Sequence, residues 1–460
     1  MSSNFNDTDK LLEGTARRAI VYLRGLSQRA VAPTEEAMKN LERLKSDLPE
    51  RPTSPKRVIT LLDRYGSPAT IASNGGRYFG FVTGSTLPAS IAANWLATSW
   101  NQNAAKMIMS PVATLLEATA ISWIKGLIGL PKGSEGAFVS GATMANFTGL
   151  AAARHAVLNQ VNWNVERNGL FGAPPINVVV GEEFHSSVGK ALTMLGFGRD
   201  RIIKVPTDSE GRIKVRALPK VSGPTILCVQ AGNVNTGAFD PFRDLIKWAK
   251  ENQAWVHVDG AFGLWAAVSP RFRHLTAGLT GADSWATDGH KWLNVPYDSG
   301  ITFVRNPMNM AASMGNPSAA YIHFDTSNDR SEFTPEQSRR ARGVDAWAAL
   351  LSLGRSGLKD LIERSCDHAA RFATLLRESG CSILNEVVLN QVLVSFGDDD
   401  FTKGVIKALQ KEGTCWCGET LWKGKVAMRI SVSSWKTTQD DVDRSVTSIL
   451  KLVRDMEKKI

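Results

Sequence analysis

A chain of 460 residues, of which 43% are hydrophobic, is long enough to bury a large core and to form two or three domains. Its formal net charge is +10, but the basic residues are scattered. This argues against nucleic-acid binding, since proteins of that class concentrate charge on one face or tail. The N-terminus has no basic region followed by an apolar one, and no window approaches about 18 uninterrupted apolar residues. We therefore expect a cytoplasmic protein without a membrane partner.

The five cysteines give no sign of a disulfide framework or of a metal site. Their number is odd, and Cys415 and Cys417 have one residue between them and no second cysteine pair to complete a zinc site. We expect reduced thiols and no bound metal.

The first part of the chain, assigned as residues 1–85, resembles an appendage to the main body. Two amphipathic stretches, 9–26 and 34–44, predict short helices, and several prolines interrupt the pattern after them. Helices this short are unstable alone, so their apolar faces should pack on the body or on a partner subunit.

Between about residues 110 and 305, helical stretches alternate with short, almost wholly apolar runs. The predicted strands are 176–180, 201–205, 225–230, 255–259, 284–287 and 301–304. Such runs indicate strands covered on both faces, and intervening helices such as 241–252 indicate crossover connections. The pattern predicts a mainly parallel sheet in a large α/β domain, 86–343, whose ligands lie outside the carboxyl ends of the strands.

The last part of the chain predicts a separate small domain, 344–460. A long helix is expected over 344–378, with an interruption near Gly354 and Gly357. After it, strand-like runs alternate with helical stretches, at 387–396, 402–411, 426–432 and 440–458. Such a mixture is typical of a small α+β domain.

Lys291 and Asp259 are the two residues that most strongly suggest a chemistry. Lys291 lies in Asp288-Gly-His-Lys-Trp-Leu-Asn294, which is unusually apolar for an exposed lysine, and Asp259 ends the predicted strand 255–259. A lysine amine can condense with an aldehyde cofactor, and a carboxylate at the end of a strand can keep a pyridine nitrogen protonated. The pair predicts pyridoxal phosphate, held as a Schiff base on Lys291.

A phosphate site is expected where small residues open the helical stretch 144–159. These residues are Ser140, Gly141, Ala142 and Thr143. Backbone amides at a helix N-terminus, together with the two hydroxyls, would form an anion cradle, although the same residues also make an ordinary helix cap. His290 would add a phosphate contact, and Ala261 would leave room for the ring to lie flat.

His185 and Asn233 each follow a predicted strand. The imidazole of His185 would stack on the cofactor ring, but a histidine at such a junction also serves as a helix cap or a packed neutral side chain. Asn233 would orient the phenolic oxygen of the ring. Spacing alone supports neither assignment.

Together these segments resemble the pyridoxal-dependent group II decarboxylases, which include the aromatic-amino-acid, glutamate and cysteine-sulfinate decarboxylases. The motifs that carry the resemblance are Ser140-Gly-Ala-Thr143, His185-Ser-Ser187, Gly232-Asn-Val-Asn-Thr-Gly-Ala-Phe-Asp240, His257-Val-Asp-Gly-Ala261 and Asp288-Gly-His-Lys-Trp292. The resemblance begins near Arg77 and continues through 333–342 to 428–433, so it covers most of the chain.

The resemblance implies the aspartate-aminotransferase fold (fold type I), with a mainly parallel seven-stranded sheet and a small α+β domain. It implies an obligate homodimer with active sites at the interface, and an N-terminal segment packed on the partner. It also implies a Schiff base on Lys291, a pyridinium partner in Asp259, a stacking histidine in His185 and a small residue beneath the ring in Ala261. The implied phosphate contacts are Ala142, Thr143 and His290.

The family uses a loop tyrosine to protonate the product carbanion, and Tyr321 falls at about that place, although it also reads as an ordinary loop residue. Two departures weaken any transfer of substrate. Asp288 stands where animal members commonly have Asn, so its contact would be anionic and cannot simply donate to phosphate. Asn233 stands where several members have Thr.

The expected reaction is decarboxylation of an L-amino acid to an amine and carbon dioxide. The same cofactor also serves aminotransferases, aldehyde synthases and carbon-carbon lyases, and Tyr321 favours decarboxylation because related aldehyde synthases often carry Phe there. Outside enzymology, the alternative is a cofactor-free binding protein. The sequence does not identify the amino acid.

Overall fold

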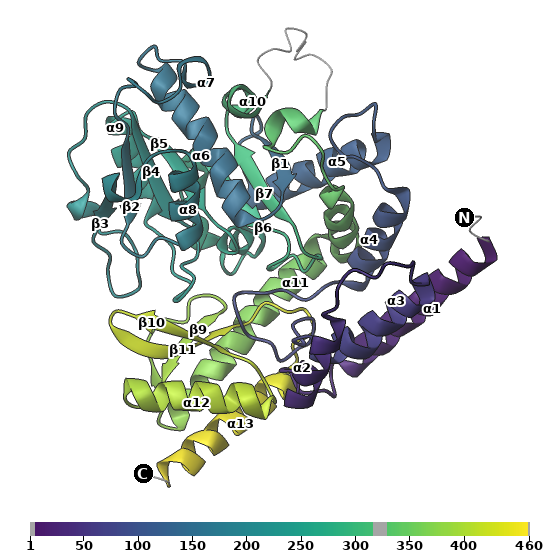
Figure 1. The fold of residues 1–460 in the computed structure, drawn as a ribbon. Coiled ribbons are helices and arrows are strands. Elements are labelled where there is room, and N and C mark those ends of the chain that lie inside the picture. Colours follow the sequence, from purple (N-terminus) through teal and green to yellow (C-terminus); the bar gives the residue numbers. More distant parts are fainter. Residues whose placement is uncertain (1–4, 316–328, 459–460) are drawn as a thin grey trace.

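The computed structural model describes residues 5–315 and 329–458, and the larger of its two sheets has seven strands (Figure 1). In sequence order they are β1 (Glu135–Val139), β2 (Asn177–Gly181), β3 (Ile202–Val205), β4 (Thr225–Gln230), β5 (Trp255–Asp259), β6 (Ser284–Asp288) and β7 (Gly300–Val304). Their order in the sheet is β1-β7-β6-β5-β4-β2-β3. Only β7 runs against its neighbours, so the carboxyl ends of β1 to β6 share one edge. The predicted mainly parallel sheet is confirmed.

Helices cover both faces of this sheet. Successive residues of a strand point to opposite faces, so neighbouring residues pack with different helices. Val178 and Val180 pack with α6 (Ala142–Asn159) and α8 (Ser186–Met194). Val179, between them, belongs to the hydrophobic core on the other side, which also contains side chains of α5 (Pro111–Ile128) and α9 (Phe242–Glu251). Burial on both faces explains why the strands are apolar throughout rather than alternating.

One long helix, α11 (Arg342–Glu378), connects the two domains (Figure 1). It packs first on α4 (Pro88–Trp100) and α5, and then on the small domain. Gly354 has non-helical backbone angles inside it, with φ of 59°, which confirms the predicted interruption.

The small domain has an antiparallel four-stranded sheet in the order β10-β11-β9-β8. Its strands are β8 (Ser382–Ile383), β9 (Gln391–Ser395), β10 (Gly418–Trp422) and β11 (Lys425–Ser431), and its helices are α12 (Asp399–Glu412) and α13 (Gln439–Glu457). Apolar side chains of both helices and of α11 pack together on β9 and β11. The predicted α+β character is confirmed, whereas the boundaries at 85/86 and 343/344 stay predictions.

The N-terminal segment lies along one side of the molecule (Figure 1). Its helices are α1 (Phe5–Gly25), α2 (Glu35–Leu41) and α3 (Pro55–Leu61); the two short helices of the large domain are α7 (Val165–Asn168) and α10 (Pro307–Met314). The part of the segment after α1 is tied to the small domain, because Val31 donates to the Gly413 carbonyl at 2.8 Å and Arg77 to the Thr414 carbonyl at 2.7 Å. By contrast, no side chain of α1 between residues 7 and 25 is buried.

A buried ion pair joins α5, β1 and the segment before α11. The side chains of Glu117 and Arg339 are 1% and 0% exposed, and their Oε1 and Nη2 atoms are 2.9 Å apart. Phe138 of β1 bonds to both, with its amide donating to Glu117 and its carbonyl accepting from Arg339. Within the described residues, α5 is the one helix with the length and apolar composition of a membrane span, yet it carries this buried carboxylate.

We expect Arg339→Met to destabilise the protein by about 3–5 kcal/mol, because it leaves the Glu117 carboxylate buried without its partner. Urea unfolding followed by tryptophan fluorescence measures the effect. The control Arg444→Met removes an exposed i,i+4 pair with Asp440 and should cost less than about 1 kcal/mol. Equal unfolding midpoints for the two variants would contradict the assignment.

Candidate active site

Lys291 lies in the turn that follows β6, at the edge where the parallel strands end. Its side chain is 16% exposed, and its Nζ is 3.5 Å from Oδ2 of Asp288, the last residue of β6. The segment at Gly84 packs directly on this turn, because a Cβ on Gly84 would lie 1.8 Å from the Lys291 carbonyl oxygen. Only glycine permits that approach. The amine therefore lies in a narrow, mostly buried place.

Asn294, at the end of the same turn, holds it in position. Its buried Oδ1 accepts from the amides of Ser85 and Trp435 at 2.9 and 3.0 Å, and its Nδ2 donates to the Ser433 carbonyl at 3.0 Å. One side chain thus links the lysine turn to the segment before α4 and to the small domain.

Asp259 ends β5 with its carboxylate almost completely buried, since the residue is 5% exposed. Oδ1 accepts from the amide of Ala261 at 3.2 Å, and Oδ2 accepts from Nδ2 of Asn146 at 3.3 Å. Neither donor is a cation. Among the described residues, no positively charged side chain forms a hydrogen bond with this carboxylate. A protonated ring nitrogen would supply that charge.

His185 is the N-cap of α8, because its Nδ1 accepts from the amide of Ser187 at 3.2 Å. This is the helix-cap role that was the alternative to stacking on the cofactor ring. Burial lowers the pKa of His185; the charge of Asp259 opposes that effect, and the charges of Lys291 and Arg429 add to it. Its Nδ1 also lies 2.7 Å from Ser187 Oγ, which Asn146 links to Asp259, so the histidine lies beside the end of β5.

The predicted phosphate cradle lies at the N-terminus of α6. Gly141 is its N-cap, and no side chain caps the helix, so the first-turn amides of Ala142 and Thr143 are available to an anion. Ser140 connects β1 to this turn. The turn is pressed against β7, because a Cβ on Gly300 would lie 2.3 Å from the carbonyl carbon of Gly141.

His290 and Asp288 lie beside the cradle. The Nδ1 atom of His290 accepts from the Ser299 amide at 3.2 Å, so in the neutral ring the proton is on Nε2, which lies 3.5 Å from Asp288 Oδ2. Burial lowers the pKa of His290, and Asp288 opposes this shift. A Cβ on Gly141 would lie 3.6 Å from the imidazole and 3.9 Å from Asp288 Oδ1.

These residues fit pyridoxal phosphate in every respect but one. An amine, a buried carboxylate and an uncapped helix N-terminus meet at one edge of the sheet, as the cofactor's aldehyde, ring nitrogen and phosphate require. The exception is Asp288, which is 2% exposed and whose Oδ1 has no hydrogen-bond partner although it faces the cradle. An anion there would meet this oxygen directly.

Asn233 is occupied by local contacts. Its Oδ1 accepts from the amides of Asn235 and Thr236, and its Nδ2 donates to the Glu183 carbonyl at 3.3 Å. The side chain therefore holds the turn after β4, and its contact with the cofactor ring remains a prediction. The same holds for Ala261, whose amide binds Asp259. Tyr321 lies outside the described residues.

Three side chains of this region were not predicted from the sequence: Asn146, Asn294 and Arg429. Burial lowers the pKa of Arg429, which stands in β11 and donates to Oδ1 of Asn235 at 3.3 Å. A single charged residue inside the apolar run Val-Ala-Met-Arg-Ile was the available signal for it.

Residues 39–397 match the model of the pyridoxal-dependent decarboxylase conserved domain. An aromatic-L-amino-acid decarboxylase of Bacillus atrophaeus is 27% identical, over 95% of this chain and 93% of that protein. A phenylacetaldehyde synthase of a Rosa hybrid cultivar is 29% identical, over 73% and 69% respectively. The crystal structure of Oryza sativa TDC with PLP and tryptamine shares the fold, with a TM-score of 0.90, coverage of 99% of both chains and 22% identity.

The family match spans most of the chain, and the aminotransferase-type fold implied by the sequence motifs is confirmed by the solved structure. The chain therefore belongs to the pyridoxal-dependent decarboxylases, enzymes that release the carboxylate of an amino acid as carbon dioxide with pyridoxal 5'-phosphate as cofactor.

Proposed function

We propose that this decarboxylase binds its cofactor through Lys291 and Asp259 and acts on an amino acid with an aromatic or large apolar side chain. The observation that carries the first part is that the Lys291 amine, the buried Asp259 carboxylate and the uncapped N-terminus of α6 all lie at the carboxyl edge of the sheet. When bound, pyridoxal phosphate supplies an electron sink for the bond that breaks when carbon dioxide leaves.

Each side chain then has a distinct task. Asp259 would keep the ring nitrogen protonated, and Lys291 would supply the amine that holds the cofactor's aldehyde. The Arg429 guanidinium binds the substrate carboxylate before it leaves, and His185 lies against the ring. Tyr321 is the proposed donor of the proton that replaces carbon dioxide on the α-carbon.

Aromatic rings gather beside the lysine turn, and they support the proposed substrate class. Tyr297 stacks on His290 with ring centroids 4.2 Å apart. Phe81 lies 5.3 Å from Trp416 and is 61% exposed, with a positive φ of 55°. A non-glycine residue in that conformation is uncommon and often marks a functional site.

We expect Lys291→Ala to lose carbon dioxide release by at least ~10³-fold, because the amine that holds the cofactor is gone. The assay measures carbon dioxide, amine, aldehyde and oxo acid from aromatic, aliphatic and acidic amino acids. Aromatic substrates should react fastest and give the amine. Borohydride reduction followed by peptide mass spectrometry should label Lys291.

Lys190→Ala is the matched control, since Lys190 is an exposed lysine on α8. It should retain full activity. Undiminished release by Lys291→Ala would refute the assignment of the lysine. Faster turnover of aspartate or glutamate would refute the substrate class, and an aldehyde product would place the chain with the aldehyde synthases.

A second prediction concerns Asp288. Its unpartnered oxygen faces the cradle, so Asp288→Asn exchanges a negative oxygen for an amide that can donate to phosphate. We expect the variant to bind pyridoxal phosphate about 10-fold more tightly, the order of one hydrogen bond to a charged group. Titration of the apoprotein, followed by tryptophan quenching, gives the dissociation constant.

Asp283→Asn is the control, because Asp283 directly precedes β6 at its opposite end and contacts Arg305. It should leave cofactor affinity unchanged. Weaker binding by Asp288→Asn would show that the carboxylate itself is required at the site.

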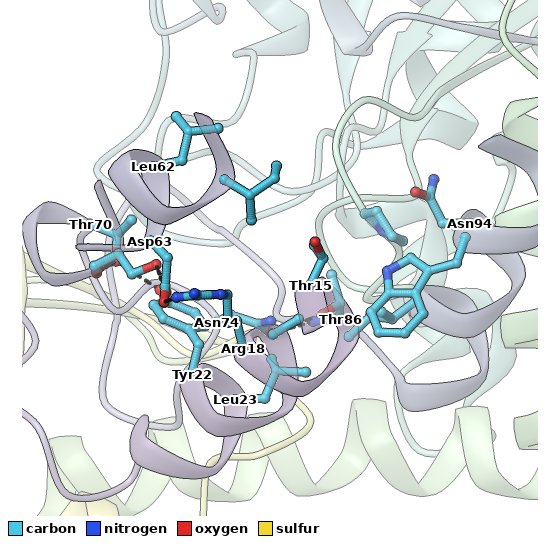
Figure 2. A pocket seen from close by; sticks show the side chains of 16 residues that line it. Thr15, Arg18, Tyr22, Leu23, Leu62, Asp63, Thr70, Asn74, Thr86 and Asn94 are labelled. Carbon is cyan, nitrogen blue, oxygen red and sulfur yellow. Dashed lines mark hydrogen bonds and ion pairs between the residues drawn. The ribbon is translucent and has the colours of Figure 1, made fainter. Parts of the chain in front are cut away.

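We also propose that the active unit is a homodimer. A groove of about 570 Å³ lies between α1, α4 and the segment after α3, and Thr15, Arg18, Tyr22 and Asp63 line it (Figure 2). Large apolar side chains are exposed nearby in sequence, on α4 and the loop after it: Trp95, Leu96, Trp100, Ile108 and Met109. A second copy of the chain would cover this surface and the apolar face of α1.

Light scattering should therefore give twice the mass of 50.0 kDa for the wild type. The double variant Leu96→Glu/Ile108→Glu should be monomeric, because these side chains are 55% and 90% exposed and their charge would be buried in the dimer. Leu421→Glu, at a 66% exposed apolar position in β10, should stay dimeric. A monomeric wild type would refute the proposal.

A further inference from the structure

A buried chain of hydrogen bonds leads from the core beneath the sheet to the candidate site. It begins at Trp255, whose Nε1 donates to Ser284 Oγ at 2.8 Å; the same oxygen is 2.8 Å from Nδ1 of His257. His257 Nε2 lies 2.9 Å from Oδ1 of Asn146. Asn146, Ser284 and His257 are all completely buried, so water does not compete for these bonds.

The other end of Asn146 reaches two groups of the site. Its Nδ2 lies 3.3 Å from Asp259 Oδ2 and 3.1 Å from Ser187 Oγ. Ser187 Oγ in turn lies 2.7 Å from Nδ1 of His185. One amide on α6 thus contacts the carboxylate directly and the histidine through one hydroxyl.

The direction of the first bonds follows from donor capacity. The Asp259 carboxylate can only accept, so Asn146 presents Nδ2 to it and Oδ1 to His257 Nε2. The Ser284 hydroxyl accepts from the Trp255 indole and can donate its own proton to His257 Nδ1. Burial lowers the pKa of His257 to about 4, and the ring is neutral at pH 7. Its one proton is therefore on Nε2, which donates to Asn146 Oδ1.

The rest of the chain is then determined. With Oδ1 of Asn146 accepting from His257, its Nδ2 must face the site, where its two protons serve Asp259 and Ser187. The Ser187 hydroxyl accepts one of these and donates its own proton to His185 Nδ1. That nitrogen also accepts from the Ser187 amide, so it carries a lone pair. The proton of neutral His185 is on Nε2.

The fold makes room for this arrangement at one position of α6. A Cβ on Gly149 would lie 2.8 Å from Cε1 and 2.9 Å from Nδ1 of His257. Any other residue at 149 would push the imidazole out of reach of Asn146. Helix α6 therefore carries both Asn146 and the glycine that leaves space for the His257 ring.

We propose that Asn146 is a positioning residue, oriented by His257, that holds the Asp259 carboxylate in one orientation and, through the Ser187 hydroxyl, adds to the Ser187 amide in keeping the proton of His185 on Nε2. His185 then presents a hydrogen-bond donor to the site rather than a base. The inference rests on the proposed function, which places both residues at the cofactor.

The test reads the imidazole nitrogens directly. Full-length protein with ¹⁵N-histidine, with and without pyridoxal phosphate, gives solid-state NMR signals from seven histidines, and the one lost in His185→Gln identifies His185. We expect the Nε2–H tautomer in the wild type. Asn146→Leu should mix the tautomers and weaken cofactor binding about 10- to 100-fold, since a bond to a charged group is lost.

Two variants of His257 keep the test decisive if Asn146→Leu does not fold. His257→Gln retains a donor toward Asn146 and should keep the His185 tautomer, whereas His257→Leu removes the donor and should mix it. Asn94→Leu, which breaks a bond to Asp345 on α11, is the control and should change neither readout. An Nδ1–H tautomer in the wild type, or an unchanged tautomer in both Asn146→Leu and His257→Leu, would overturn the proposal. The tautomer does not depend on Lys291, so failure of the proposed function is distinguished separately by the Lys291→Ala assay.

Discussion

The buried carboxylate of Asp259 constrains which groups can lie at the carboxyl edge of the sheet. An ionised aspartate loses several kcal/mol of hydration when it is buried, and hydrogen bonds recover only part of that cost. Asp259 receives one bond from the Ala261 amide and one from Asn146. The remaining requirement is for a positive charge, which a protonated ring nitrogen of pyridoxal phosphate would meet at the proposed site. The carboxylate proposed to orient the cofactor would therefore itself be stabilised by the cofactor.

The proposed phosphate cradle depends on a buried ion pair. Glu117 and Arg339 bond to the amide and the carbonyl of Phe138. These bonds fix the end of β1, directly before the cradle begins at Ser140. The pair also links α5 to the segment before α11. The cradle is therefore supported by elements that lie outside the sheet. Its rigidity comes from ionic contacts and close backbone packing rather than from the cradle's own small side chains.

The sequence predicted best where a residue's local pattern determines its structure. The strands at 225–230 and 255–259 were predicted to the residue, because their apolar runs end abruptly in polar residues. The first strand, Glu-Gly-Ala-Phe-Val, was missed because its small residues give little β signal. Lys291 and Asp259 were evident beside apolar runs. Asn146 was not, since its partner Asp259 is 113 residues away and nothing near it in the chain suggests the contact.

The attachment of the lysine turn by Asn294 has a mechanical consequence. The same side chain binds the backbone of the small domain at Ser433 and Trp435, while α11, the connection between the domains, has its helical geometry broken at Gly354. If the small domain rotated about that break, it would have to rupture the Asn294 bonds or drag the lysine with it. The amine and the Arg429 side chain on β11 are thus mechanically coupled, and closure of one domain on the other would set the distance between the group that holds the cofactor and the group proposed to hold the substrate.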